Sequence, residues 1–350
     1  MALNQELNQT AKQTVKVIDD CPLEDIQAVI EAMNIENTVQ PVIFKGACRH
    51  WPLVQAGLDS AKSAADYLLS FYQETPVTAY YVAPEHKGRV FYNEQVNGFN
   101  YQASQLNLRQ VIDKLFAHQD DQLPPSIYMG STEINHFLPG LAAENSVNID
   151  PIKPLTSVWL GNQSRIAAHF DFPQNLACNV VGKRTFTLFP PEQVANLYIG
   201  PMEFAPGGQE ISMVDFDNPD FERFPKFTHA LAASQTAELE AGDVLYVPSM
   251  WWHHVAGNQA FNVLITHWWR DSPGYLGRPN NALALAMLSL RSLPKAQRQA
   301  WKAMFEHYVF DHDDDDVAHI PKEAQGMQTK PLDELNARKL RADLINKLKR

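Results

Sequence analysis

The sequence predicts a mainly β protein with helical flanks, in which a jelly-roll-like double sheet forms the core. Two observations predict it. From residue 155 onward, short runs of strand-forming residues alternate with frequent proline and glycine turns, as in small barrels and sandwiches. After residue 272 the pattern changes to helical spacing. We therefore expect an N-terminal helical segment over 1–34, a barrel with flanking elements over 35–272, and a C-terminal helical region over 273–350.

The part before the barrel mixes helical and extended patterns. One helical face of residues 22–33 carries four apolar side chains, Ile26, Val29, Ile30 and Met33. Residues 60–72 and 107–118 are further helix candidates, whereas residues 77–82 and 90–92 are rich in strand formers. We expect these α/β elements to flank the barrel.

The pattern His-x-Asp occurs three times, and its surroundings separate the copies. His118 and His312 stand in polar and acidic runs, which predict solvated loops. His169 and Asp171 instead lie between two runs of strand formers that each end at a glycine, over 156–161 and 175–182. Because residues two apart on a strand point the same way, one strand can direct both side chains at a single metal. The alternative is a core histidine paired with a neighbouring aspartate.

Two later strands add further polar candidates. In the alternating run 183–189, an inward Phe186 also turns Arg184 inward, and a buried guanidinium needs an anion. The apolar run 244–248 leads to adjacent histidines, His253 and His254, of which only one can face the interior of a barrel. Two histidines and one carboxylate form the facial set that holds non-haem Fe(II) and leaves three positions open. We therefore expect an iron site.

These motifs resemble the JmjC-like, cupin-type oxygenases that use Fe(II) and 2-oxoglutarate. Within that family, the chain most resembles the branch that contains the asparaginyl hydroxylase that inhibits hypoxia-inducible factor. This branch also has bacterial members. The likeness covers roughly residues 35–272 and implies a double-stranded β-helix. It is most specific in four stretches: His169-Phe170-Asp171 with Gln174-Asn175, residues 182–191, residues 214–225, and Trp251-Trp252-His253-His254.

The resemblance assigns the metal site and part of the co-substrate site. It makes His169, Asp171 and His253 the iron ligands, and it matches Tyr128 and Asn175 to positions that contact 2-oxoglutarate. At one further matched position this chain differs from its relatives. Arg184 stands where they place a lysine for the distal carboxylate, and a guanidinium can grip a carboxylate through two hydrogen bonds.

Other positions depart from the family pattern. Ile166 replaces a hydroxyl residue that contacts the co-substrate, and His267 replaces an asparagine. His267 is therefore either a donor to the bound acid or a satisfied core histidine. Trp251 and Trp269 are expected to make the substrate pocket apolar, with plain core packing as the alternative.

The activity implied by the resemblance is hydroxylation with O2 as oxidant and decarboxylation of 2-oxoglutarate to succinate. A protein or peptide side chain is favoured over a small molecule as substrate. Two alternatives stay open. One is a metal-binding cupin protein that acts without 2-oxoglutarate, and the other is a non-catalytic binding protein on the same barrel.

Composition excludes several classes of function. The net charge is −11, with 40 acidic and 29 basic side chains, which argues against nucleic acid as a partner. The three cysteines are too few and too widely spaced for a disulfide framework, which suits a reducing, cytoplasmic location. Residues 1–9 lack the pattern of a signal peptide, and the chain has no run of about 18 apolar residues that would span a membrane.

The C-terminal region predicts helices that need a cover. Residues 281–290 are apolar nearly all round, and Pro294 opens a second helical run that extends to residue 305. A helix that is apolar on every side must be buried against something. The resemblance implies a homodimer through these helices, and the alternative is a tail that folds back on its own barrel.

Overall fold

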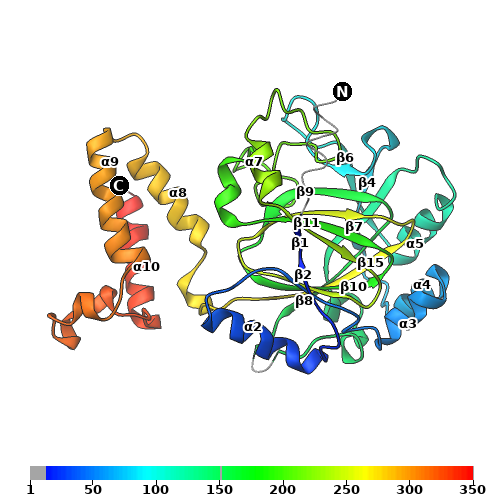
Figure 1. The fold of residues 1–350 in the computed structure, drawn as a ribbon, viewed down its shortest axis with the longest axis horizontal. Helices are drawn as coiled ribbons and strands as arrows, with labels where there is room; N and C mark the ends of the chain where they lie inside the picture. Colours follow the sequence, from blue (N-terminus) through cyan, green and yellow to red (C-terminus); the bar gives the residue numbers. More distant parts are fainter. Residues whose placement is uncertain (1–12, 150–151, 350) are drawn as a thin grey trace. The chain divides into compact units, whose positions relative to one another are not determined.

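The computed structural model describes residues 13–149 and 152–349 (Figure 1). The chain divides into two compact units, the first ending at Trp269 and the second beginning at Arg270. Residues 1–9, for which the sequence predicts no signal peptide, lie outside the described residues.

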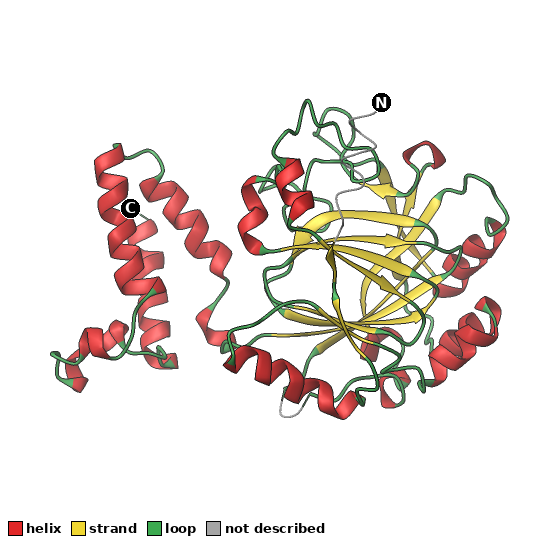
Figure 2. Ribbon diagram, in the orientation of Figure 1, coloured by secondary structure: helices red, strands yellow, loops and turns green. Residues whose placement is uncertain are grey.

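The first unit consists of two β-sheets with helices around them, which confirms the predicted fold class (Figure 2). The six-stranded sheet has the order β1 (Gln13–Thr14), β12 (Gln235–Leu239), β11 (Arg184–Phe189), β14 (Trp252–Gly257), β9 (Ser164–Phe170) and β5 (Arg89–Val90). The nine-stranded sheet has the order β2 (Lys16–Ile18), β3 (Val42–Phe44), β13 (Val244–Val247), β10 (Gln174–Val181), β15 (Asn262–Trp269), β8 (Leu155–Gly161), β7 (Ser126–Glu133), β4 (Val77–Val82) and β6 (Tyr101–Leu106).

Helices surround these sheets, and the three predicted from periodicity are present: α2 (Ile26–Ile35), α4 (Ala61–Ser70) and α5 (Leu108–Ala117). The first begins later than the pattern predicts because residues 23–25 form a 3-10 turn. The predicted strand 90–92 is shortened to β5. The sequence analysis did not predict three further helices, α3 (Pro52–Asp59), α6 (Ile134–Phe137) and α7 (Phe227–Ala232).

Alternation along the strands divides the first unit into two apolar regions. On β10, Leu176 and Cys178 face the helix-covered side of the nine-stranded sheet, where α2, α3, α4 and α5 pack. Ala177 on the same strand faces the other sheet and packs with Phe186 and Leu188 of β11. The space between the sheets is thus enclosed by apolar side chains, and it is the part of the unit that holds the candidate site.

The chain leaves the sheets between β11 and β12. This long excursion runs over residues 190–234, includes α7, and has its own apolar cluster around Phe189 and Phe227. Its segment 200–211 is held to the barrel by hydrogen bonds of Ser212, whose backbone N–H donates to the carbonyl of Ala168 at 2.8 Å. The excursion therefore brings loop residues to the edge of the space between the sheets.

The second unit is helical, as the sequence predicts. It contains α8 (Pro279–Leu290), α9 (Lys295–Phe305) with a π-helical turn over Glu306–Phe310, and α10 (Glu334–Leu348). The expectation of a solvated loop is wrong for His312, whose side chain is only 11% exposed and donates from Nε2 to the carbonyl of Gln328 at 2.8 Å. In the described residues, no helix combines the length and apolar character that crossing a membrane requires.

Candidate metal centre and its cavity

Three side chains from two neighbouring strands converge on one point between the sheets. His169 lies near the end of β9, Asp171 follows directly after it, and His253 lies on β14. Because β9 and β14 are antiparallel with His253 opposite His169, the two rings meet with centroids 4.3 Å apart. One ligand atom from each of the three side chains lies within 4.8 Å of the others, and no second group of this kind occurs in the described residues. Their mutual spacing suits a single divalent cation.

Backbone carbonyls fix the proton positions of both histidines. The Nδ1–H of His169 donates to the carbonyl of Ala167 at 2.9 Å, and that of His253 donates to the carbonyl of Trp251 at 3.0 Å. A carbonyl can only accept, so each Nδ1 carries the proton and each Nε2 presents a lone pair. Burial, and then the nearby charge of His169, lowers the pKa of His253 to about 4. His253 is therefore neutral near pH 7, as a metal ligand must be.

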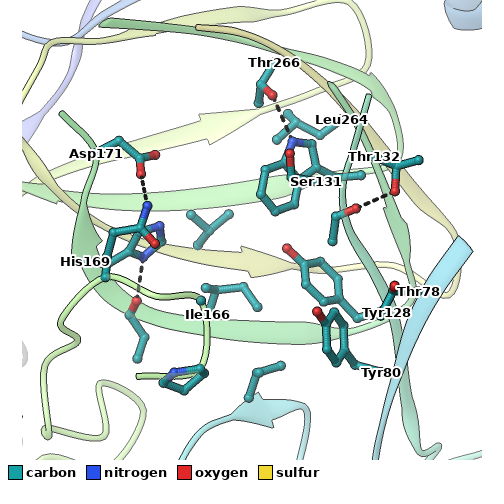
Figure 3. A pocket seen from close by; sticks show the side chains of 18 of the residues that line it. Thr78, Tyr80, Tyr128, Ser131, Thr132, Ile166, His169, Asp171, Leu264 and Thr266 are labelled. Carbon is teal, nitrogen blue, oxygen red and sulfur yellow. Dashed lines mark hydrogen bonds between the residues drawn. The ribbon is translucent and has the colours of Figure 1, made fainter. Parts of the chain in front are cut away.

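The two carboxylate oxygens of Asp171 have different neighbours. Oδ2 lies 3.7 Å from Nε2 of His253 and so belongs to the convergent group. Oδ1 accepts a hydrogen bond from Nε2 of Gln209 at 2.9 Å, which is the dashed line at Asp171 in Figure 3. One oxygen is thus directed at the metal position and the other is occupied by a residue of the excursion.

His254 faces the opposite side of its sheet, as the alternation predicts. Its ring stacks on Phe216 with centroids 4.8 Å apart, and Arg165 and Asp215 are among the charged groups that act on it. Phe216 belongs to the excursion, so His254 helps to hold that segment against the barrel. Of the two adjacent histidines, His253 alone points to the metal position.

A cavity of about 580 Å³ opens beside this group and is lined by residues of both sheets (Figure 3). His169, Asp171 and His253 line it, as do the three residues matched to the co-substrate: Tyr128 from β7, Asn175 from β10 and Arg184 from β11. Figure 3 shows Tyr80 and Tyr128 side by side along one wall. The structure therefore brings six of the nine predicted site residues to one cavity. They are the three of the metal group together with Tyr128, Asn175 and Arg184.

Arg184 is a buried cation that lacks an ionic partner. Its side chain alternates inward with Phe186 and Leu188, which confirms the predicted orientation, and the residue is 5% exposed. Its Nε lies 3.5 Å from Oδ1 of Asn179, and none of the ion pairs in the described part of the chain includes it. Burial lowers the pKa of Arg184 to about 10, which leaves it charged near pH 7. An unpaired buried charge at a cavity wall favours an anionic ligand.

Tyr128 and Asn175 offer further polar atoms to such a ligand. Burial raises the pKa of Tyr128, so its phenol stays protonated and can donate. Oδ1 of Asn175 is buried and has no hydrogen-bond partner among the described residues. A buried polar atom without a partner is costly, and a ligand would remove that cost.

His267, Trp251 and Trp269 do not line the cavity, which corrects their sequence-based assignments. On β15 the cavity is lined by Thr266 and Trp268, so His267 and Trp269 point to the opposite face. His267 is fully buried there, and its Nε2 accepts from the backbone N–H of Val147 at 3.1 Å. Burial also lowers the pKa of His267 to about 4. It is a satisfied core histidine rather than a donor to the bound acid.

Trp269 and Trp251 are both core residues, but they pack in different apolar clusters. Trp269 stacks on Tyr246 with ring centroids 6.4 Å apart, on the helix-covered side of the sheet. Trp251 is 9% exposed and packs into the apolar cluster between the sheets, near Leu188 and Val247. Neither contributes to the cavity wall.

The sequence analysis missed the residues that give the cavity its character. Among them are four aromatic residues on four different strands, Tyr80, Tyr101, Trp159 and Trp268. Apart from the metal group and Arg184, none of the lining residues carries a charge. Counting alternate positions from Leu264 would have selected Trp268, whereas no periodicity in the excursion singles out Gln209.

Comparison with known proteins gives one family and several partial relatives. Residues 28–275 match the family described as cupin-like domain. The lysine-specific demethylase JMJ31 of Arabidopsis thaliana is 32% identical over 123 residues, which are 34% of this chain and 22% of the relative. The tRNA wybutosine-synthesizing protein 5 of Gallus gallus is 36% identical over 105 residues, 30% of each chain. The Jumonji C domain-containing protein 5 of Drosophila melanogaster is 24% identical over 287 residues, 77% of this chain and 65% of the relative. The matches to the first two therefore span less than a third of those relatives.

Proposed function

The chain belongs to the cupin-like domain family, and from that premise we propose that it is an Fe(II)- and 2-oxoglutarate-dependent oxygenase. One observation carries the proposal. Two imidazoles with Nε2 lone pairs directed inward and one carboxylate oxygen share a space of metal-site size, beside a cavity that also holds an unpaired guanidinium. The donor set fits Fe(II), which two histidines and one carboxylate hold while leaving three positions open.

Each residue of the site would have its own role. His169, Asp171 and His253 would hold the metal, and Arg184 would pair with the distal carboxylate of 2-oxoglutarate through two parallel hydrogen bonds. Tyr128 would add a hydroxyl donor. When bound, Fe(II) would supply the chemistry that converts 2-oxoglutarate and O2 into succinate and CO2 and places one oxygen atom in a C–H bond of the substrate. The protein would supply orientation and exclude water.

The wall of the cavity favours an uncharged reacting group. Tyr80, Tyr101, Trp159 and Trp268 offer ring faces, while hydroxyls such as that of Thr266 already accept hydrogen bonds within the wall. We propose a protein or peptide side chain as the substrate. One relative is named for lysine and another for tRNA, and the net charge of −11 disfavours a nucleic-acid substrate.

Titration of 2-oxoglutarate into the Fe(II)-loaded protein without oxygen tests the proposal. We expect a visible charge-transfer absorbance that saturates at one 2-oxoglutarate per metal, followed by succinate formation when O2 is admitted. The same titration with Zn(II) controls for absorbance that does not come from iron. If Fe(II) binds but millimolar 2-oxoglutarate produces neither absorbance nor succinate, the site acts without 2-oxoglutarate, an alternative that Ile166 in the cavity wall favours.

We also propose that the protein is a homodimer joined through the helices of the second unit. α8 has no buried residue, and Leu288 is 76% exposed there. Apolar side chains are also exposed on α9 and α10, among them Trp301 and Ile345. Exposed apolar surface spread over several helices is typical of an interface, and a second copy would cover it.

Sedimentation at micromolar concentration tests the dimer. The expected particle has twice the chain mass of 39.5 kDa. Leu288→Glu places a charge on the exposed face of α8 and should give a folded monomer, with the circular dichroism spectrum of the wild type. A wild-type particle of 39.5 kDa would contradict the proposal.

A further inference from the structure

Gln209 links the excursion between β11 and β12 to the metal group. Its side-chain amide donates to Oδ1 of Asp171 at 2.9 Å, and Gln209 itself lines the cavity together with Pro206 and Gly207. We propose that Gln209 is a positioning residue for Asp171, so that metal binding and closure of the segment 200–211 over the cavity are coupled. This inference rests on the metal site of the proposed function and does not require 2-oxoglutarate.

The hydrogen bond selects which oxygen of Asp171 faces the metal. A carboxylate can rotate about its last torsion, and in one orientation it can offer both oxygens to a cation. Here the amide holds Oδ1, while Oδ2 remains 3.7 Å from Nε2 of His253. The backbone at Asp171 is also fixed, because its carbonyl accepts from the N–H of Met250 at 2.9 Å. Gln209 thus removes the remaining freedom of the ligand and keeps it to one oxygen.

The segment that carries Gln209 is anchored at separate points. The hydroxyl of Tyr92 donates to the carbonyl of Phe204 at 2.6 Å, and the hydroxyl of Tyr101 donates to the carbonyl of Pro206 at 3.2 Å. The ring of Phe204 stacks on Phe99 with centroids 4.6 Å apart. The base of the segment therefore packs against aromatic side chains of the barrel.

Two glycines lie between these anchors and Gln209. Gly207 and Gly208 are both exposed, and Gly208 has a positive φ of 86° with no atom near the position of a Cβ. This pair gives the backbone freedom directly before Gln209. Beyond these glycines, the side chain of Gln209 is held to the barrel by the amide contact with Asp171.

Linkage makes the two events reciprocal. If the Gln209 contact raises the affinity for the metal by some factor, bound metal must favour the closed segment by the same factor. Hydrogen-bond partners of metal ligands typically change metal affinity by about 10- to 100-fold when they are removed. The metal-bound protein should therefore hold the segment closed more tightly than the metal-free protein.

The test measures metal affinity and protection of the segment in the full-length protein. Gln209→Met keeps the length of the side chain but removes the donor, and Gln102→Met is the matched control at an exposed position on β6. With Mn(II) as the probe, calorimetry should show a dissociation constant about 10- to 100-fold higher for Gln209→Met and unchanged for the control. Hydrogen exchange over residues 203–209 should slow when Mn(II) binds to the wild type and to the control, and should not respond to Mn(II) in Gln209→Met.

Two outcomes would overturn the inference. One is a Gln209→Met dissociation constant within about two-fold of the wild type, and the other is exchange over 203–209 that ignores Mn(II) in the wild type. Equal melting temperatures of the metal-free variants would show that both are folded. Failure of the oxygenase proposal would give a different result. Mn(II) would still bind and slow hydrogen exchange over residues 203–209, but the protein would not respond to 2-oxoglutarate.

Discussion

Replacing Asp171 with alanine is expected to abolish both metal binding at micromolar concentration and all turnover of 2-oxoglutarate. Asp171 is the only anionic member of the metal group, and the two remaining ligands are imidazoles. Neutral ligands alone leave the charge of a divalent cation uncompensated in a site where the side chains of His253 and Asp171 are 5% and 11% exposed. The loss should exceed the roughly 10- to 100-fold effect expected for removing a hydrogen-bond partner of a ligand. Calorimetry with Mn(II) and a succinate assay with Fe(II) measure the two effects separately.

Two adjacent histidines provide the control for this prediction. His253→Asn should lose metal binding as Asp171→Ala does, whereas His254→Asn should keep it, because His254 stacks on Phe216 on the other face of the sheet. His169→Ala belongs with the first group. Melting temperatures show whether each variant is folded. Turnover that survives in Asp171→Ala or His169→Ala would rule out this set of ligands.

Local patterns predict much of the fold because they act within single elements. β11 alternates buried and partly buried positions over most of its length, as period two predicts, whereas β10 and β13 are buried throughout. α4 and α5 begin where a side chain accepts a backbone N–H, at Ser60 and at Asn107. α10 lies within the region 273–350 that the sequence predicts to be helical, although no separate helix was predicted for its 15 residues. Sheet order depends on pairings distant in sequence, and here only the family resemblance implied it.

In the candidate site, too, local sequence patterns predict some residues, whereas others depend on the tertiary structure. His169 on β9 and Asp171 directly after that strand are two residues apart, and period two also turns Arg184 inward, so these three follow from the sequence. His267 was assigned by matching its position to relatives and Trp269 as an apolar pocket residue, in both cases without counting alternate residues from Leu264. That count places Thr266 and Trp268 in the cavity instead.

Gln209 could not be predicted by either route. It lies in a part of the excursion that forms neither helix nor strand, where neither period two nor a helical period applies. Its contact with Asp171 joins residues 38 positions apart and depends on how residues 190–234 pack against the barrel. Loop residues that touch a site are defined by the tertiary structure rather than by a local pattern.

Replacing Arg184 with methionine should weaken 2-oxoglutarate binding by about 30- to 4000-fold while leaving Mn(II) binding unchanged. The range converts the roughly 2–5 kcal/mol that is lost when one partner of a buried, hydrogen-bonded charge pair is removed. Arg184 is the only lining residue outside the metal group that carries a charge, so the distal carboxylate would have no substitute partner. A 2-oxoglutarate titration of the Fe(II)-loaded variant, followed by charge-transfer absorbance, gives the dissociation constant.

The same substitution should act on stability in the opposite direction. In the ligand-free protein the guanidinium is 5% exposed and has no ionic partner among the described residues, so replacing it with an apolar side chain of similar length should preserve or raise the melting temperature. Arg184→Lys keeps the charge but loses the paired hydrogen bonds, and its affinity for 2-oxoglutarate should fall between those of the wild type and Arg184→Met. Binding to Arg184→Met within a few-fold of the wild type would mean that another group receives the distal carboxylate. A variant that loses affinity while it gains stability would identify Arg184 as a residue kept for the ligand, because its charge does not stabilise the fold.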